Sequence, residues 1–125
     1  VCSGNHDVSE SGDVSWMRAS NIYADGDIKT LEGIKFGCAP YLCADILDFA
    51  ECDVLLTHIP PTHMQTSIER GRDFGDKELF RALKYGLLKA KIILCGHVHN
   101  LLLDIDKIGD CAIYNSSLKL NILEI

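Results

Sequence analysis

The chain has 125 residues and a mass of 13.8 kDa, which suffices for one folded domain and is too little for two. Hydrophobic residues make up 47% and charged residues 24%, and the mean hydropathy of +0.09 excludes a disordered chain. Lys and Arg number 12 against 18 Asp and Glu, so a net charge of −6 excludes a broad nucleic-acid surface. No apolar run approaches the roughly 20 residues of a membrane-spanning helix, so we expect no membrane contact.

The chain contains no internal repeat, low-complexity tract or linker, so we expect residues 1–125 to form a single domain. It begins at Val1 without a secretory leader, a start that we interpret as a cut in a longer chain. Its six cysteines show neither a CxxC pair nor zinc-finger spacing, and three lie in apolar runs, where a free thiol behaves as a small hydrophobe. Reduced cysteines of this kind predict a cytoplasmic protein.

The predicted elements alternate between strands and helices. In chain order, the pattern predicts a strand at residues 29–36, a short helix at 44–50, a strand at 53–57, a longer helix at 76–90, and strands at 91–95, 112–114 and 118–125. Asp76 is the expected N-cap of the longer helix, and Gly86 weakens its end. The continuous apolar runs 54–56 and 92–94 are typical of strands covered on both faces. The predicted class is therefore α/β or α+β, and we adopt α/β.

Histidine follows an apolar, strand-like run at three places along the chain. One amide and four imidazoles stand at these three turns: Asn5 and His6, His58, and His97 and His99. In an open α/β sheet the loops beyond the carboxyl ends of the strands converge, and ligands bind there. We therefore expect these side chains to lie together.

The residue types at these turns indicate a metal site. Neutral imidazoles with an amide oxygen suit manganese, iron, zinc or cobalt, and the absence of cysteine there argues against a closed structural zinc site. His97 and His99 are two residues apart, so a strand continuing through them would direct both to one side, toward one metal or toward two adjacent metals. Gly4 and Gly96 are expected to let the backbone turn sharply before the ligands.

The ordered set Gly4-Asn5-His6-Asp7, then His58, then Gly96-His97-Val98-His99 resembles the second half of the signature of the calcineurin-like metallophosphoesterases. The residues from Leu55 to Pro61 are also similar to small bacterial members of that family. Three linked motifs in suitable strand context are specific, whereas any one of them alone would be weak. The resemblance covers nearly the whole chain and implies an αββα fold, a sandwich of two sheets flanked by helices.

The resemblance also implies a function and roles for the motif residues. The implied activity is that of a phosphoric ester hydrolase, a phosphatase or phosphodiesterase acting on a small molecule or nucleotide with two divalent metal ions (manganese, iron, zinc or cobalt). Asn5, His58 and His97 would bind one metal and His99 the other, with a bridging hydroxide as nucleophile. His6 would stabilise or protonate the leaving oxygen, and Asp7 would orient His6.

Two opening motifs of the family, Asp-x-His and Gly-Asp-x-x-Asp, are absent from this chain. The remaining metal ligands are all neutral, so we expect weak metal binding and no activity from this chain alone. We interpret it as the C-terminal portion of a metallophosphoesterase domain whose N-terminal half is absent. The strands of that half would flank the first motif, so we expect an exposed sheet edge and an apolar face that favour self-association.

A second class of function stays open, that of a catalytically silent scaffold or interaction module with the same fold. The retained ligand residues favour the enzyme, because a scaffold does not require them, whereas the absent motifs favour the scaffold. Asp-x-His and Gly-Asp-x-x-Asp upstream of Val1 in the reading frame would support the enzyme.

Several residues have two interpretations. Arg70 and Arg72 are either a solvated basic pair or a clamp on a substrate phosphate, and His63 is either a solvated loop histidine or a substrate contact. Asp7 is either the orienting carboxylate or a turn former, and residues 115–117 form either a loop near the site or a simple turn.

Overall fold

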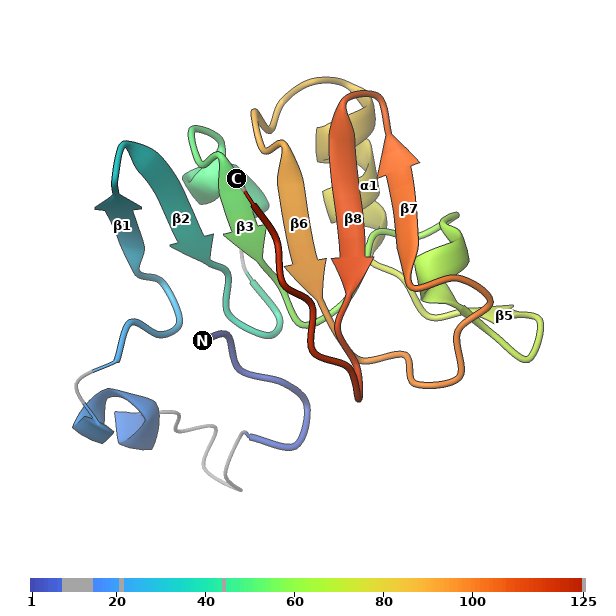
Figure 1. Cartoon of the computed structure of the whole chain (residues 1–125), viewed down its shortest axis with the longest axis horizontal. Coiled ribbons are helices and arrows are strands. Elements are labelled where there is room, and N and C mark those ends of the chain that lie inside the picture. The colour runs from blue at the N-terminus through green and yellow to red at the C-terminus, as the bar shows by residue number, and fades with distance from the viewer. Residues whose placement is uncertain (8–14, 21, 44, 125) are drawn as a thin grey trace.

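A computed structural model of the chain describes residues 1–7, 15–20, 22–43 and 45–124 and shows a mixed α/β fold (Figure 1). Six strands form one mixed sheet, and two short strands form a small second sheet. Within the described residues there is a single α-helix, α1 (Lys77–Lys84), together with three 3-10 segments: η1 (Ser15–Ser20), η2 (Ile46–Phe49) and η3 (Gln65–Ser67). The predicted α/β class is confirmed at this level.

The large sheet brings the carboxyl ends of several strands to the same end of the sheet. Its order is β1 (Ile28–Leu31), β2 (Ile34–Cys38), β3 (Val54–Leu56), β6 (Ile92–Cys95), β8 (Cys111–Asn115) and β7 (Ile105–Ile108). The four inner strands β2, β3, β6 and β8 are parallel, and the two edge strands pair antiparallel with their neighbours. The segments that follow β3, β6 and β8 therefore all leave from the same end of the sheet, the lower end in Figure 1. The small sheet is a hairpin of β4 (Ile68–Glu69) and β5 (Arg72–Asp73).

One face of the large sheet carries the core. Leu55, Ile93 and Ile113 are fully buried and stand in register on three neighbouring strands. They pack in one apolar cluster with Leu79 and Ala82 of α1, the helix that lies behind the sheet in Figure 1. Burying an aliphatic side chain of this size stabilises the fold by about 1.5–3 kcal/mol.

The opposite face of the sheet is only partly covered. Leu56, Leu94 and Tyr114 form a second row across the same three strands and are half-buried. The coverage on both faces that we expected for 54–56 and 92–94 is therefore complete at Val54 and partial at Leu56, Ile92 and Leu94. Strand β1 is an edge strand and is exposed along all four residues. The exposed edge expected beside the first motif is a different place, because residues 1–7 form no strand, and self-association stays a prediction.

Two predicted elements differ in extent. The strand expected at 29–36 is a hairpin, because Glu32 and Gly33 both have positive φ (50° and 86°) and turn the chain between β1 and β2. The helix expected at 76–90 begins after Asp76, whose carboxylate accepts hydrogen bonds from the backbone of Glu78 and Leu79. It ends at Lys84, because Gly86 is left-handed (φ 67°), so the prediction for 85–90 was wrong.

The short helix predicted at 44–50 corresponds to η2, whose N-cap is Asp45, and Ala44 lies outside the described residues. Strand β7 was not predicted. Its alternation of exposed and half-buried residues spans only four positions, two of which are charged.

The two ends of the chain were predicted less well. Residues 1–4 form no strand and are held beside the sheet, with the Val1 amino group donating to the Tyr23 carbonyl. Residues 118–124 form no strand either, contrary to the prediction for 118–125, and Ile125 lies outside the described residues. No helix in the described part of the chain has the length and apolar character needed to cross a membrane.

Candidate metal centre

Three of the predicted ligand atoms converge at one point. Nε2 of His58 lies 2.8 Å from Oδ1 of Asn5 and 3.1 Å from Nδ1 of His97. The two imidazole rings meet edge to face with centroids 4.9 Å apart. Residues 53 and 39 positions apart in sequence are thus brought together from the N-terminal turn, the end of β3 and the end of β6.

The N-terminal turn reaches His58 through a close approach of backbone to ring. A Cβ built on Gly4 would lie 2.6 Å from Cε1 of His58, so no larger residue fits without movement. The carboxylate of Asp7 accepts a hydrogen bond from the Gly4 backbone N–H (2.8 Å), and the Asp7 N–H donates to the Gly4 carbonyl. Ser3 is buried and tied to Asp25 and Tyr41, so this segment is anchored although it is no strand.

The loop after β6 does not continue as a strand. His97 has a left-handed backbone (φ 68°), which costs about 1–3 kcal/mol in a residue other than glycine. Val98 is buried and His99 is exposed, so the two histidines do not share the single strand face considered from the sequence. Gly96, which we expected to turn the backbone sharply before the ligands, does not have a positive φ; the left-handed residue is His97 itself.

Asn115 holds this loop in place. The two N–H groups of its fully buried Nδ2 are shared among the carbonyls of Gly96, Val98 and Thr66, and its Oδ1 accepts from the Ser117 N–H. This buried amide is the partner of the Val98 and Thr66 carbonyls, whereas the Gly96 carbonyl also accepts a hydrogen bond from the Val98 N–H. From the sequence, residues 115–117 were predicted only as a loop near the site or a simple turn. The one signal for Asn115 was its place as a polar residue directly after an apolar run.

The convergent atoms form a set that fits a metal ion. A neutral histidine carries a single ring N–H and an amide oxygen carries none, so His58 Nε2 has at most one proton to share between Asn5 Oδ1 and His97 Nδ1. A divalent cation would accept an electron pair from each of the three atoms, and two imidazole nitrogens with one amide oxygen suit manganese, iron, zinc or cobalt. The donor set therefore fits one such ion.

Burial and mutual proximity keep these histidines neutral. Burial lowers the pKa of His58 below its ordinary value, His97 lowers it further, and the charge of Asp7 opposes the shift. Burial also lowers the pKa of His97, with His99 adding to the effect. Neutral imidazole is the form that binds metal, so both rings are ready to act as ligands at neutral pH.

The other predicted site residues surround this group without joining it. His6 and His99 are exposed, and within the described residues no hydrogen bond links either of them to the three convergent atoms. Asp7 bonds to the backbone of Gly4, as a turn former does, and its charge acts on His58. No cluster of three or more His, Cys, Asp or Glu side chains exists in the ranges described, because the third member of the convergent group is an amide. All six cysteines are free.

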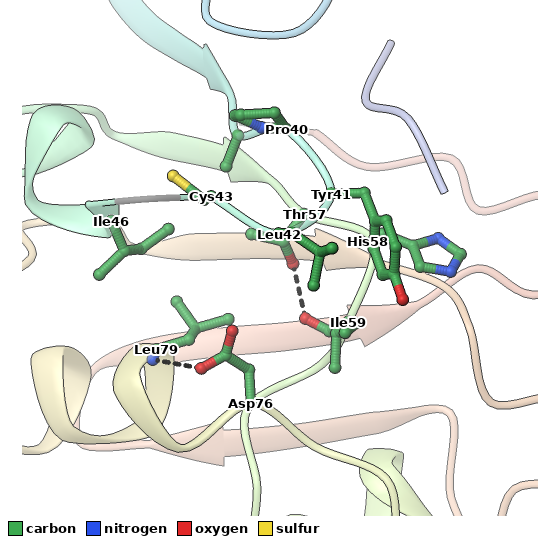
Figure 2. Close-up of a pocket in the computed structure, with 11 residues that line it drawn as sticks. Pro40, Tyr41, Leu42, Cys43, Ile46, Thr57, His58, Ile59, Asp76 and Leu79 are labelled. Carbon is green, nitrogen blue, oxygen red and sulfur yellow. Dashed lines mark hydrogen bonds between the residues drawn. The ribbon is translucent and has the colours of Figure 1, made fainter. Parts of the chain in front are cut away.

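A narrow cavity adjoins the centre on the Tyr41 side. The Tyr41 ring packs edge-on against His58 with centroids 5.4 Å apart, and Ile59 and Asp76 also line the cavity (Figure 2). The cavity measures about 30 Å³, room for only one or two water molecules. The cavity is therefore too small for a substrate, and the role of the Tyr41 ring beside it is to support His58.

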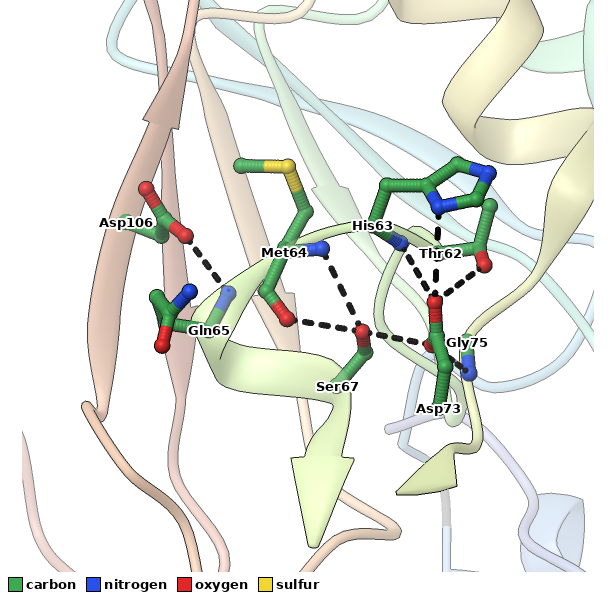
Figure 3. Close-up of polar contacts among 8 residues, drawn as sticks. All are labelled: Thr62, His63, Met64, Gln65, Ser67, Asp73, Gly75 and Asp106. Carbon is green, nitrogen blue, oxygen red and sulfur yellow. Dashed lines mark hydrogen bonds and ion pairs between the residues drawn. The ribbon is translucent and has the colours of Figure 1, made fainter. Parts of the chain in front are cut away.

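The segment between β3 and α1 is held by one carboxylate, that of Asp73 (Figure 3). It accepts hydrogen bonds from the Thr62 and Ser67 hydroxyls and from the backbone N–H groups of His63 and Gly75. Burial pushes the pKa of Asp73 upward, but these hydrogen bonds outweigh it and lower the pKa to about 2. The sequence gave no signal for this network, because the partners are spread over residues 62–75.

Comparison of the chain with protein-family models, with curated proteins and with solved structures gives no match in any of the three. No relative therefore assigns a function to this arrangement.

Proposed function

We propose that Asn5, His58 and His97 belong to the centre of a metal-dependent phosphoesterase, which hydrolyses a phosphomonoester or phosphodiester of a small molecule or nucleotide. The carrying observation is the convergence of three lone-pair donors, at 2.8 and 3.1 Å, from three distant parts of the chain. The order of the motifs, which resembles that of the calcineurin-like metallophosphoesterases, supports the same function.

The described residues have distinct tasks in this proposal. Asn5, His58 and His97 would hold a divalent metal, which when bound supplies hydroxide near neutral pH and neutralises phosphate charge. The lowered pKa of each imidazole keeps it available as a ligand, and the Tyr41 ring fixes the orientation of His58. His6 follows Asn5 and is exposed, which suits a group that gives a proton to a leaving oxygen. His99 would serve a second metal.

Two further features fit this assignment. The half-buried row Leu56, Leu94 and Tyr114 supports an αββα sandwich, because a second sheet would cover that face. Free cysteines, four of them buried, support a cytoplasmic location, where thiols stay reduced.

Metal-dependent hydrolysis tests this proposal. The protein encoded by the whole reading frame is assayed with bis(p-nitrophenyl) phosphate and p-nitrophenyl phosphate, with Mn²⁺ and with a chelator. We expect hydrolysis that requires the metal and falls by about 100-fold or more in His58→Ala and in His97→Ala, because each removes a ligand. His63→Asn is the matched control, since His63 lies outside the centre and asparagine tolerates its positive φ.

Hydrolysis that survives His97→Ala would overturn the assignment. A protein that binds metal at this centre and hydrolyses neither ester would favour the silent scaffold instead.

A further inference from the structure

We propose that Arg70 and Arg72, on the β4–β5 hairpin, bind a second phosphate group of the substrate, and that the site therefore prefers nucleotides carrying a phosphate beyond the scissile one. This inference rests on the proposed phosphoesterase function and names the class of substrate.

The hairpin stands beside the loop that carries the histidines. The side chain of Asn100, the residue after His99, donates a hydrogen bond to the Glu69 carboxylate at the end of β4. The charge of Glu69 also acts on the pKa of His97, raising it against the net downward shift. The buried Thr66 carbonyl, just before β4, is held by Asn115, which also holds the histidine loop. The hairpin and the loop that carries His97 and His99 are thus linked by two separate sets of hydrogen bonds, through Asn100 and through Asn115.

The pairing of the hairpin directs Arg72 toward that loop. Glu69 and Arg72 are directly opposite each other in the antiparallel register, and such partners project from the same face. Glu69 reaches Asn100, so Arg72 shares the face that is turned to the histidine loop. The turn is tight, with Arg70 and Gly71 both left-handed (φ 49° and 76°), and the Asp73 network fixes its base.

Neither hairpin arginine is neutralised. Among the described residues no ion pair involves Arg70 or Arg72, whereas the other two arginines pair with Asp27 and Glu78. Glu69 bonds to Asn100, and both oxygens of Asp73 accept hydrogen bonds within its own network. Two guanidinium groups therefore face solvent in a chain of net charge −6, and the guanidinium group binds phosphate oxygens in bidentate geometry.

A recess between these side chains has the size and lining for a nucleotide. It measures about 460 Å³ and is lined by Glu69, Arg70, Arg72 and Phe74. Phe74 is 43% exposed, which leaves an aromatic surface in a recess that already carries two cations. An aromatic ring on which a base stacks, next to arginines that bind phosphate, is a combination suited to a nucleoside bisphosphate.

Calorimetric binding on the metal-free protein isolates the hairpin from the metal. The probes are adenosine 3′,5′-bisphosphate and adenosine 3′-monophosphate, which differ only in the second phosphate. We expect the bisphosphate to bind about tenfold more tightly, and Arg72→Ala and Arg70→Asn each to remove most of that preference. Asparagine at position 70 keeps the left-handed turn, and Arg81→Ala, which removes an exposed arginine from α1, is the matched control.

Equal binding of the two probes, or a preference unchanged in both hairpin variants, would overturn this inference. Circular dichroism and the thermal midpoint establish that each variant is folded. Hydrolysis of the two nucleotides with Mn²⁺ is measured separately. A phosphate preference without hydrolysis would contradict the proposed function alone, and hydrolysis without the preference would contradict the hairpin role alone.

Discussion

The backbone of Gly4 lies against the imidazole of His58 so closely that a Cβ at position 4 would stand 2.6 Å from the ring. Real Cβ atoms do not tolerate such a distance, so the absence of a side chain at position 4 permits the N-terminal turn to present Asn5 to His58. The same glycine was expected from the sequence to serve a sharp turn; its role in the structure is close approach.

We therefore expect Gly4→Ala to displace His58 and to weaken Mn²⁺ binding by at least about tenfold, with overpacking costing about 1–3 kcal/mol of stability. The matched control is Gly96→Ala, whose added Cβ would meet its nearest neighbour, the Ser117 hydroxyl, at an ordinary 3.4 Å. Calorimetric titration with Mn²⁺ checks both. Equal affinities in the two variants would show that the Gly4–His58 contact does not shape the centre.

Asn115→Ala is expected to lower the free energy of unfolding by about 3 kcal/mol, because it leaves the carbonyls of Val98 and Thr66 and the Ser117 N–H without their partner in a buried place. Urea denaturation measures the change. Asn121→Ala, which removes one partly exposed hydrogen bond to Ser116, should cost less than about 1 kcal/mol. A similar small loss in both variants would mean that Asn115 does not hold the histidine loop.

The Asp73 network makes stability depend on acid pH. The folded pKa of about 2 lies below the ordinary 3.8, so the carboxylate stabilises the fold fully above pH 3.8 and loses that contribution as the pH falls toward 2. Asp73→Asn should lower the free energy of unfolding by about 2 kcal/mol at pH 7, and the difference from the wild type should shrink between pH 4 and pH 2. Urea unfolding at several pH values measures this difference in the free energy of unfolding, and Asp48→Asn, at an exposed carboxylate, is the control. A difference that does not change with pH would contradict it.

The C-terminal segment exposes an unpartnered apolar strip, with Leu118 84% exposed and Leu120 and Ile122 each 88% exposed. We propose that self-association uses this strip together with the exposed edge of the sheet. Sedimentation velocity should show Leu120→Ser with Ile122→Ser shifting the protein toward monomer. Tyr85→Ser, which removes an exposed aromatic side chain at the end of α1, away from this strip in sequence, should leave the distribution unchanged. A monomeric wild type would contradict the prediction.

The ends of β3 and β6 were predictable from the sequence because continuous apolar runs place His58 and His97 at strand tips, and parallel strands end at one edge. The left-handed backbone of His97 could not be predicted from the sequence. The Asn115 side chain that holds this loop bonds to residues 17, 19 and 49 positions away in the chain.

The alternation of residues 118–122 predicts a strand, but residues 117–118 form a turn in which Leu118 is left-handed (φ 60°), and no strand follows it in the described residues. Alternation says nothing about whether a partner strand is present. The apolar side of that segment is exposed, the reverse of the usual arrangement. The short sheet β4–β5 went unpredicted because two-residue strands carry no periodicity; their position is set by the hydrogen bonds of Asp73.

The most direct test is the number of manganese ions that the chain binds at equilibrium with excess Mn²⁺, measured by dialysis and elemental mass spectrometry, because weakly bound metal would not survive purification. One manganese per chain is expected, because one set of ligand atoms converges, and it should be lost in His97→Ala and retained in His63→Asn. No bound manganese in the wild type, or manganese retained in full by His97→Ala, would contradict the metal centre.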